Sequence, residues 1–412
     1  MNLLKYNRHW EKDFRYDFKK ERFCLKTLKE HIEKKQITEI TGLRRTGKTT
    51  LLFQVINSLL DRDVKPYNIW YFTFDEEKIK LDKLFSEFEK QTKTDFKNEK
   101  IFIFLDEIQK LSDFQSQLKI YFDLYPNIKF FISGSSSLFI RKKTQESLAG
   151  RILPIFLLPL SFKEYLYFTG QTELLEFPEM HHSKLETEYE RYWRNQFIET
   201  IFINEQADRY AYLTSILKKI IFEDIPQVFA INDPEILYSL VKIIAQQPGM
   251  YLSYENLSND LNLSSKTLSK YISILEQAFL IKTVYNFSKN RLTSEKKLKR
   301  VYLSTPSFSI ILSDYLQKGL LAENTILSQN EYRFFWRDAY KHEVDFIDIA
   351  YNDPVPIEIK YKEKVSNREL QNLYLFAKKF HAKKAILLMK RSDKKIINYK
   401  DLDIELTSIH LF

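Results

Sequence analysis

The segment GLRRTGKT at residues 42–49 constrains this chain more than any other feature. Residues 36–41 before it have the composition of a strand, and residues 50–60 after it that of a helix. A phosphate-binding P-loop requires this strand–loop–helix context. The chain holds only seven glycines in 412 residues, against roughly 29 at an average usage of about 7%. Two glycines at the required spacing are therefore hard to attribute to chance.

The motif assigns a role to each of its functional positions. Gly42 and Gly47 allow backbone torsions that point successive N–H groups at phosphate oxygens, and the following helix directs its positive end at the same place. Lys48 is expected to reach the β- and γ-phosphates, and the Thr49 hydroxyl to ligate Mg²⁺. Arg44 and Arg45 fill variable positions and are expected to be solvated. The predicted nucleotide-binding residues are Gly42, Leu43, Arg44, Arg45, Thr46, Gly47, Lys48, Thr49 and Thr50.

A pair of carboxylates follows an apolar strand further along the chain. Residues 101–105 read IFIFL, which is typical of a parallel strand buried on both faces. Asp106 and Glu107 follow it directly, about 60 residues after the P-loop, and this spacing matches a Walker B motif. Asp106 is expected to hold Mg²⁺ through water, and Glu107 to orient and polarise the attacking water.

The motifs together resemble a known group of ATPases. GLRRTGKTTLL, FLDEIQ, ISGSSS, AGR and LPLSFKEYL occur in this order within residues 42–166. They resemble a large group of prokaryotic AAA+-superfamily ATPases that carry a C-terminal domain of unassigned function. The resemblance covers nearly the whole chain, and its family-specific part is LPLSFKEYL. It implies binding of ATP rather than GTP, and ATP hydrolysis, but it implies no defined pathway.

Two further positions gain candidate roles from this resemblance. AAA+-type motors place a polar sensor at the tip of the strand expected at residues 128–133, so Ser133 and Ser135 are candidates for contacting the γ-phosphate or the water. A simple turn of small residues explains them equally well. Arg151 is a candidate for neutralising transition-state charge, within its own subunit or in a neighbouring copy of a homo-oligomer. A surface arginine is the alternative.

The middle of the chain has the pattern of a winged helix-turn-helix. Residues 161–233 are expected to form a helical lid and connector. Three helices are predicted at 234–247, 254–261 and 265–277, followed by strands at 279–285 and 301–303 with a basic loop between them. Such a module can place its third helix in the major groove and its wing on phosphates. The predicted DNA contacts are Lys266, Lys270, Lys296, Lys297, Lys299 and Arg300. A structural spacer or protein-contact module with a solvated basic turn is the alternative.

The C-terminal residues suggest a metal-dependent nuclease fold. A helix at 316–328, three strands, a helix at 367–380 and a further strand follow one another. Asp345 lies on the second strand, and Glu358 and Lys360 share one face of the third. These residues form the PD-(D/E)XK constellation, and the fold resembles that of archaeal junction resolvases and restriction endonucleases. Asp345 and Glu358 are expected to bind a divalent metal, with help from Glu323 and with Lys360 positioning water. An idle site, or simple strand-surface ion pairs, are the alternatives.

Composition adds bounds on the environment of the chain. The excess of 64 basic over 55 acidic residues gives a net charge of +9; this is compatible with nucleic acid, but a lysine-rich genome explains it as well. The most apolar stretch, residues 152–160, is about half of a membrane span of roughly 18 residues and contains two prolines. Without an apolar leader and with one cysteine, Cys24, the expected location is the cytoplasm, with no membrane partner.

These observations predict an α/β chain with four segments. They are a P-loop ATPase domain with a parallel sheet at 1–160, a helical connector at 161–233, a winged helix-turn-helix at 234–310 and a small PD-(D/E)XK-like α/β domain at 311–412. The main hypothesis is an ATP-hydrolysing, DNA-associated motor that uses Mg²⁺, with a nuclease-like C-terminal domain. A non-cleaving, ATP-dependent regulatory switch and a protein-partner ATPase are the alternatives.

Overall fold

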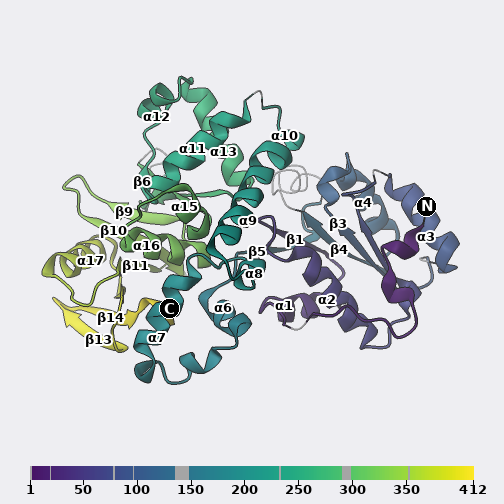
Figure 1. Ribbon diagram of the computed structural model, residues 1–412, viewed down its shortest axis with the longest axis horizontal. Coiled ribbons are helices and arrows are strands. Elements are labelled where there is room, and N and C mark those ends of the chain that lie inside the picture. Colours follow the sequence, from purple (N-terminus) through teal and green to yellow (C-terminus); the bar gives the residue numbers. More distant parts are fainter. Residues whose placement is uncertain are drawn as a thin grey trace. The chain divides into compact units, whose positions relative to one another are not determined.

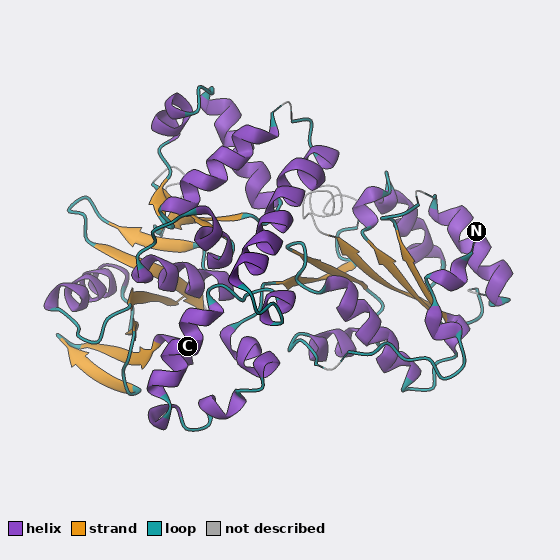
Figure 2. Ribbon diagram, viewed as in Figure 1, coloured by secondary structure: helices purple, strands orange, loops and turns teal. Residues whose placement is uncertain are grey.

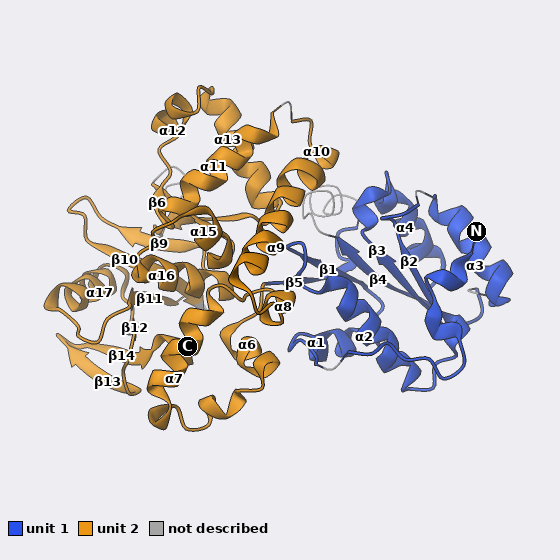
Figure 3. Cartoon of the chain, viewed as in Figure 1, with its two compact units in different colours: residues 1–158 blue, residues 159–412 orange. Residues whose placement is uncertain are grey.

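The chain divides into two compact units, residues 1–158 and 159–412 (Figures 1 and 3). The computed structural model describes residues 2–18, 20–77, 79–95, 97–134, 148–231, 233–289, 298–350 and 353–412. The first unit ends within two residues of the expected boundary at 160. The three later segments, which the sequence suggested as separate domains, form one unit because they share a β-sheet and a hydrophobic core.

The first unit is built on a five-stranded parallel sheet with the strand order β2-β3-β4-β1-β5. The strands are β1 (Ile37–Gly42), β2 (Ile69–Thr73), β3 (Ile101–Asp106), β4 (Ile128–Gly134) and β5 (Ile152–Leu157). Every residue of β1, β3 and β4 is buried, because helices cover both faces of the sheet. The strand expected at 101–105 is thereby confirmed, and the arrangement is that of a P-loop NTPase.

Four helices cover this sheet. They are α1 (Leu25–His31), α2 (Lys48–Leu60), α3 (Leu81–Thr92) and α4 (Phe114–Leu124). Helix α1 packs against α2, and α3 packs against α4; Figure 2 shows the two pairs on opposite sides of the sheet. Buried leucines of α2 and phenylalanines of α3 complete one continuous core with the strands.

The second unit contains one nine-stranded sheet. Its order is β13-β14-β12-β11-β10-β9-β7-β8-β6. The strands are β6 (Met250–Tyr251), β7 (Ile281–Asn286), β8 (Lys299–Leu303), β9 (Phe334–Arg337), β10 (Glu343–Ala350), β11 (Asp353–Lys360), β12 (Lys384–Met389), β13 (Lys395–Tyr399) and β14 (Leu402–Ser408). Parallel pairing of β7 with β9, Tyr285 opposite Phe334, joins the two halves of the sheet.

Helices form the amino-terminal part of the second unit. They are α6 (Phe162–Thr169), α7 (His182–Tyr192), α8 (Ile198–Ile201), α9 (Gln206–Lys219), a π-helical turn (Ile220–Asp224) and α10 (Ile225–Val228). The helical connector expected from the sequence is therefore present. Within the part of the chain that the structure describes, no helix is both long and apolar enough to span a bilayer.

Three capped helices come next, α11 (Pro234–Gln246), α12 (Tyr254–Asp260) and α13 (Ser265–Gln277). The Ser253 and Ser264 side chains accept hydrogen bonds from the N–H groups of Asn256 and Thr267, as expected of N-caps. The buried apolar face of α13 includes Leu268, Tyr271, Ile272 and Leu275. Strand β8 pairs antiparallel with both β6 and β7, which lie beside these helices in the sequence.

The remaining helices cover the C-terminal strands. They are α15 (Pro306–Leu312), α16 (Lys318–Gln329) and α17 (Asn367–Phe380). The apolar residues of α16 pack in one core cluster with Phe346 and Ile357, whereas those of α17 pack in another with Val344 and Leu387. Leu387 pairs with Glu358, the neighbour of Ile357 on β11, and neighbouring strand residues point to opposite faces. The two helices therefore cover opposite faces of the sheet, and the ends of α17 are those predicted.

Candidate functional site

The P-loop connects the carboxyl end of β1 to the amino end of α2. Gly47 precedes α2 with φ at 95°, in the left-handed region that glycine adopts without strain. Gly42 is required for another reason, because a Cβ atom there would lie 2.3 Å from the carbonyl oxygen of Leu157 on β5. The two glycines of the motif therefore serve a turn and a close strand contact.

Hydrogen bonds to carbonyl oxygens of the loop hold its Lys48 and Thr46 side chains in place. The Lys48 ammonium is buried and donates to the carbonyl oxygens of Gly42 at 3.1 Å and Leu43 at 3.0 Å. The Thr46 hydroxyl donates to the Leu43 carbonyl at 2.8 Å. Leu43 is buried, Arg44 and Thr50 are half-buried and Arg45 is exposed. The lysine charge thus lies across the loop, beside the N–H groups at the start of α2.

Arg22 also holds the P-loop in place, a role that no local sequence pattern predicts. Its guanidinium is buried and donates to the Thr46 carbonyl and to the Leu158 carbonyl, both at 2.9 Å. The residue lies ahead of α1, far from the motif in sequence. One side chain therefore fixes the P-loop to the segment that follows β5.

Asp106 is the centre of the site. Strand β4 lies between β1 and β3, so the carboxyl ends of all three strands meet at one edge. The Thr49 hydroxyl donates to the Asp106 carboxylate at 2.6 Å, Tyr71 on β2 donates to the same oxygen at 3.1 Å, and Ser133 at the end of β4 donates to the other oxygen. Tyr71 was not predicted to belong to the site, because it lies in the apolar run of β2 and its sequence pattern is that of a core residue.

The environment of Asp106 suits a hard cation. Only 3% of the residue is exposed. Burial, followed by repulsion from Glu107, raises the pKa of Asp106, whereas the hydrogen bonds from Ser133 and Thr49 lower it. The adjacent hydroxyl and carboxylate oxygens are the donor types that Mg²⁺ prefers, so Thr49 and Asp106 fit the predicted ion. Its side-chain hydrogen bonds come from the hydroxyl groups of Thr49, Tyr71 and Ser133, and the charge of Lys48 also lowers the pKa of Asp106.

Glu107 is turned by the backbone at the end of β3. It has φ at 52°, in the left-handed region, and is half-buried. Its N–H donates to Asp106 at 3.1 Å, and its carboxylate accepts a hydrogen bond from the Gln109 amide. The structure therefore brings Lys48, Thr49, Asp106, Glu107 and Ser133 to one edge of the sheet. Ser135 lies outside the described residues.

Arg151 lies at the opposite edge of the sheet. Strand β5 is parallel to β1 and pairs Ile152 with Ile37, so Arg151 stands at the amino end of β1. A six-residue strand places its two ends roughly 16 Å apart. The guanidinium binds both carboxylate oxygens of Asp123, at 2.9 and 3.0 Å. The expectation that Arg151 acts on phosphates within its own subunit is therefore wrong, and a role in a neighbouring copy stays a prediction.

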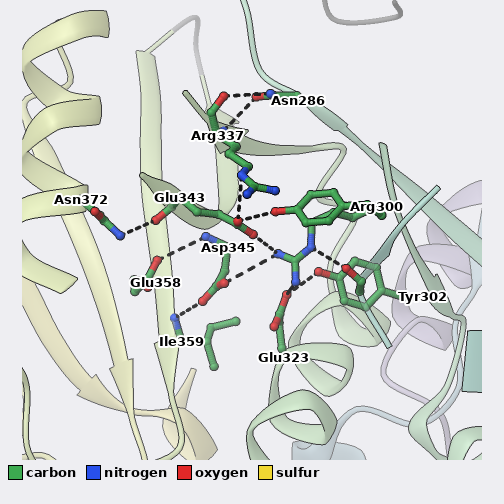
Figure 4. Close-up of polar contacts among 12 residues, drawn as sticks. Asn286, Arg300, Tyr302, Glu323, Arg337, Glu343, Asp345, Glu358, Ile359 and Asn372 are labelled. Atoms are coloured by element: carbon green, nitrogen blue, oxygen red, sulfur yellow. Dashed lines mark hydrogen bonds and ion pairs between the residues drawn. The ribbon is translucent and has the colours of Figure 1, made fainter. Parts of the chain in front are cut away.

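The second predicted site brings its four residues together, and Figure 4 shows the three carboxylates among them. Pairing of Phe346 with Ile357 sets Asp345 on β10 opposite Glu358 on β11. The Lys360 ammonium lies 2.6 Å from Glu358 and 3.4 Å from Asp345. Glu323 reaches the same place from α16, and Glu343 adds a fourth carboxylate that sequence reasoning did not include. We call Glu323, Glu343, Asp345 and Glu358 the carboxylate cluster.

Arg300 belongs to this cluster and not to a DNA-binding surface. Its guanidinium is buried and lies 2.6 Å from Glu323 and 3.3 Å from Glu343. The expectation that Arg300 contacts DNA phosphates is therefore wrong, because β8 begins at Lys299 and turns the Arg300 side chain into the sheet core. The carboxylates do not fit the predicted divalent metal, since an arginine already compensates them. Among the described residues, no group of three or more His, Cys, Asp or Glu is arranged to hold a metal ion.

The remaining predicted DNA contacts differ in their exposure, and two of them lie outside the described residues. Lys266 and Lys270 are exposed on α13. Lys299 is half-buried, with its ammonium 5.0 Å from the centre of the Tyr285 ring. Lys296 and Lys297 lie outside the described residues. Among the predicted DNA contacts that the structure describes, Lys266 and Lys270 of α13 are the exposed ones.

Three family models match successive parts of the chain. Residues 34–166 match an AAA domain, residues 201–318 a domain of unknown function (DUF8612) and residues 318–409 another domain of unknown function (DUF4143). The first match covers the P-loop, the Asp106 site and β5. Together with the strand order and the geometry, it identifies the first unit as a P-loop ATPase domain of the AAA type.

Relatives extend over most of the chain. Two uncharacterized proteins of Methanocaldococcus jannaschii are 26% and 28% identical to this chain in alignments of 402 and 392 residues. These alignments cover 87% and 90% of this chain and 84% and 83% of theirs. An uncharacterized protein of Haemophilus influenzae is 30% identical over 257 residues, 59% of this chain and 61% of that one. The S. cerevisiae Hsp104:casein complex matches 67% of this chain and 53% of that chain at 14% identity, with a TM-score of 0.35, too low to carry an argument.

The position of Arg151 generates a prediction. Replacing Arg151 with Ala should leave ATP turnover by the full chain within about twofold of wild type, because the side chain lies across the sheet from the P-loop. Phosphate release at saturating ATP measures this, and Asp123→Ala is the matched control because it removes the same ion pair. A loss of about tenfold or more in Arg151→Ala alone would contradict the prediction and place this arginine in a neighbouring copy's site.

Proposed function

We propose that this chain binds ATP with Mg²⁺ and hydrolyses it at the Asp106 edge of the first unit. The observation that carries the proposal is the 2.6 Å contact between the Thr49 hydroxyl and the Asp106 carboxylate, with the Lys48 ammonium held across the same loop. The match of residues 34–166 to an AAA domain supports ATP as the nucleotide. A bound Mg²⁺ would neutralise negative charge that develops on the phosphate oxygens.

Each residue of the site has its own role in binding or hydrolysing ATP. N–H groups of the P-loop and the amino end of α2 bind phosphate oxygens, and Lys48 exchanges its carbonyl partners for phosphate. Thr49 and Asp106 provide oxygen ligands. Glu107 orients the attacking water and accepts its proton, because its carboxylate follows Asp106 directly and is half-buried. Ser133 positions Asp106 by hydrogen bonding.

Replacing Glu107 with Gln should separate binding from hydrolysis. The amide cannot accept the proton, so turnover should fall by about 10²-fold or more while ATP affinity stays within a few-fold of wild type. Lys48→Ala should instead weaken ATP binding itself. Phosphate release and fluorescent-nucleotide titration measure the two quantities.

Glu76→Gln is the matched control for Glu107→Gln. Glu76 also follows a parallel strand of the same sheet, but its carboxylate is exposed and pairs with Lys5 at 3.0 Å. Its replacement should change neither quantity. Normal turnover by Glu107→Gln would show that the catalytic role of Glu107 is wrong.

We also propose that α11, α12 and α13 with β6, β7 and β8 form a winged helix-turn-helix that binds duplex DNA. The antiparallel pairing of β8 with β6 and β7 behind three short helices supports this. On α13, Leu268 and Ile272 face the core, whereas Lys266 and Lys270 are exposed one turn apart. A helix with this division can face a groove with its cations directed at phosphates.

Neutralising Lys266 and Lys270 together should weaken duplex binding and its salt dependence. Each phosphate contact contributes a slope of about −0.9 in a plot of log K against log salt, so the double alanine variant should lose up to about 1.8 of slope. Fluorescence anisotropy with a labelled duplex at several salt concentrations measures this. The control is Lys83→Ala with Lys90→Ala, two exposed lysines of α3.

The same titration separates the alternatives. Equal slopes for the α13 variant and the control would reject DNA binding by α13. Absence of any salt-dependent DNA binding by wild type would favour the protein-partner ATPase, in which these helices are a scaffold. Neither outcome would affect the proposal of ATP hydrolysis, whose test uses no DNA. Assembly into a homo-oligomer stays a prediction.

A further inference from the structure

The carboxylate cluster is a strongly charged buried feature of the second unit, apart from the nucleotide site of the first. Its members come from α16, β10 and β11, and Glu323, Asp345 and Glu358 are all buried. Carboxylates at this density repel one another and lose hydration, so they need positive charge nearby to remain ionised. A divalent metal provides that charge in a nuclease site. Here the protein provides it.

Arg300 is the central cation of the cluster. Its side chain is 7% exposed and enters from β8, with Nη2 2.6 Å from Glu323 and Nη1 3.3 Å from Glu343 and 3.7 Å from Asp345. Its Nε also donates to the Gly249 carbonyl at 2.8 Å. Figure 4 shows the guanidinium pointing at carboxylates from two elements, α16 and β10. A guanidinium stays protonated in proteins, so this charge is permanent.

Lys360 completes the compensation on the other side. Its ammonium lies 2.6 Å from Glu358 and 3.4 Å from Asp345. Asp345 also accepts the Ile359 N–H at 2.9 Å. Glu323 accepts a hydrogen bond from the buried Tyr302 hydroxyl. Glu358 accepts the Asp345 N–H at 3.3 Å. Each of the three carboxylates expected to bind metal therefore already has an internal cation within ion-pair distance and a further hydrogen-bond donor.

The geometry points to Arg300 as a built-in replacement for the divalent metal of this site. The second unit then binds its partners without cleaving them, which is the non-cleaving alternative for this fold. A metal ion could enter only if it displaced a buried guanidinium from several carboxylates, and a buried ionic group left unpaired is strongly unfavourable. This inference does not depend on ATP hydrolysis in the first unit.

The same contact gives the cluster a mechanical role. Arg300 ties β8 to Glu323 in the middle of α16. From the neighbouring strand β7, the Lys282 ammonium donates to the carbonyls of Leu327 at 2.8 Å and Asn330 at 3.2 Å, at the end of the same helix. Two strands of the helix-turn-helix segment thus hold α16 of the C-terminal segment at two points. The residues expected to form a catalytic site instead connect strand β8 to helix α16 within the second unit.

Binding of Mn²⁺ to the nucleotide-free full chain tests the inference. We expect wild type and Glu358→Gln to bind the same number of Mn²⁺ ions, because the cluster of wild type takes none. Arg300→Met should bind one ion more than wild type, and Arg300→Met with Glu358→Gln should lose it again. Electron paramagnetic resonance of free Mn²⁺ measures the stoichiometry, and circular dichroism verifies the fold of each variant.

The matched control is Arg337→Met. Arg337 is a second arginine at the rim of the cluster, 3.9 Å from Glu343, and its loss leaves Arg300 in place. It should therefore bind Mn²⁺ as wild type does. A folded Arg300→Met that gains no ion would overturn the inference.

Comparison of wild type with Glu358→Gln tests the inference even if Arg300→Met does not fold. One Mn²⁺ ion bound by wild type and lost in Glu358→Gln would show that metal displaces Arg300, and would overturn the inference. Cleavage of duplex, single-stranded or branched DNA with Mn²⁺ that Glu358→Gln abolishes would do the same. Equal Mn²⁺ stoichiometry, with no such cleavage, supports it.

Discussion

The contact between Thr49 and Asp106 depends on the order of the strands, and the nucleotide site depends on that contact. The two residues are 57 positions apart. Strand β4 separates β1, which leads through the P-loop to Thr49 in α2, from β3, which ends at Asp106. Because all strands are parallel, their carboxyl ends lie at one edge, where the start of α2 and the end of β3 can meet across β4. The small Ser133 at the end of β4 fills the space between and binds Asp106. A larger or apolar side chain there would separate the loop from the carboxylate.

The carboxylates of the two acidic sites of this chain are stabilised in different ways. Around Asp106, hydroxyl groups of Thr49, Tyr71 and Ser133 donate hydrogen bonds. Such donors stabilise a carboxylate without cancelling its charge, so it can still attract a cation. In the carboxylate cluster, Arg300 and Lys360 cancel charge through ion pairs. The first arrangement favours a reversible ligand, whereas the second favours a permanent structure.

Features that depend on local sequence were predictable. The P-loop, the apolar run of β3, the serine caps of α12 and α13 and the ends of α17 follow from residue type and periodicity. Strands β13 and β14 were missed, although β14 alternates Leu402, Ile404 and Leu406 inward with charged residues between them. The joining of β7 to β9 could not be foreseen, because pairing between distant strands leaves no local signal.

Errors at the candidate sites have identifiable causes. Arg151 directly precedes a parallel strand, β5. A residue before such a strand lies at the amino ends of the strands, whereas the P-loop and Asp106 lie at their carboxyl ends. The position of Arg151 just before an apolar run was already visible in the sequence. Arg300 was grouped with a basic loop because β8 was expected to begin at Val301. Its start at Lys299 places Arg300 inside a strand, where alternation decides which face the side chain takes. Arg22 and Tyr71 act through contacts that only the folded chain creates.

The Mg²⁺ dependence of ATP affinity tests the central claim most directly. The affinity of the full chain for ATP would be measured with Mg²⁺ and with a chelator, for wild type, Thr49→Val and Asp106→Asn. If these two side chains hold the ion together, Mg²⁺ should strengthen ATP binding by wild type, and each variant should lose most of that gain while still binding metal-free ATP. A gain from Mg²⁺ that is as large in both variants as in wild type would contradict the account.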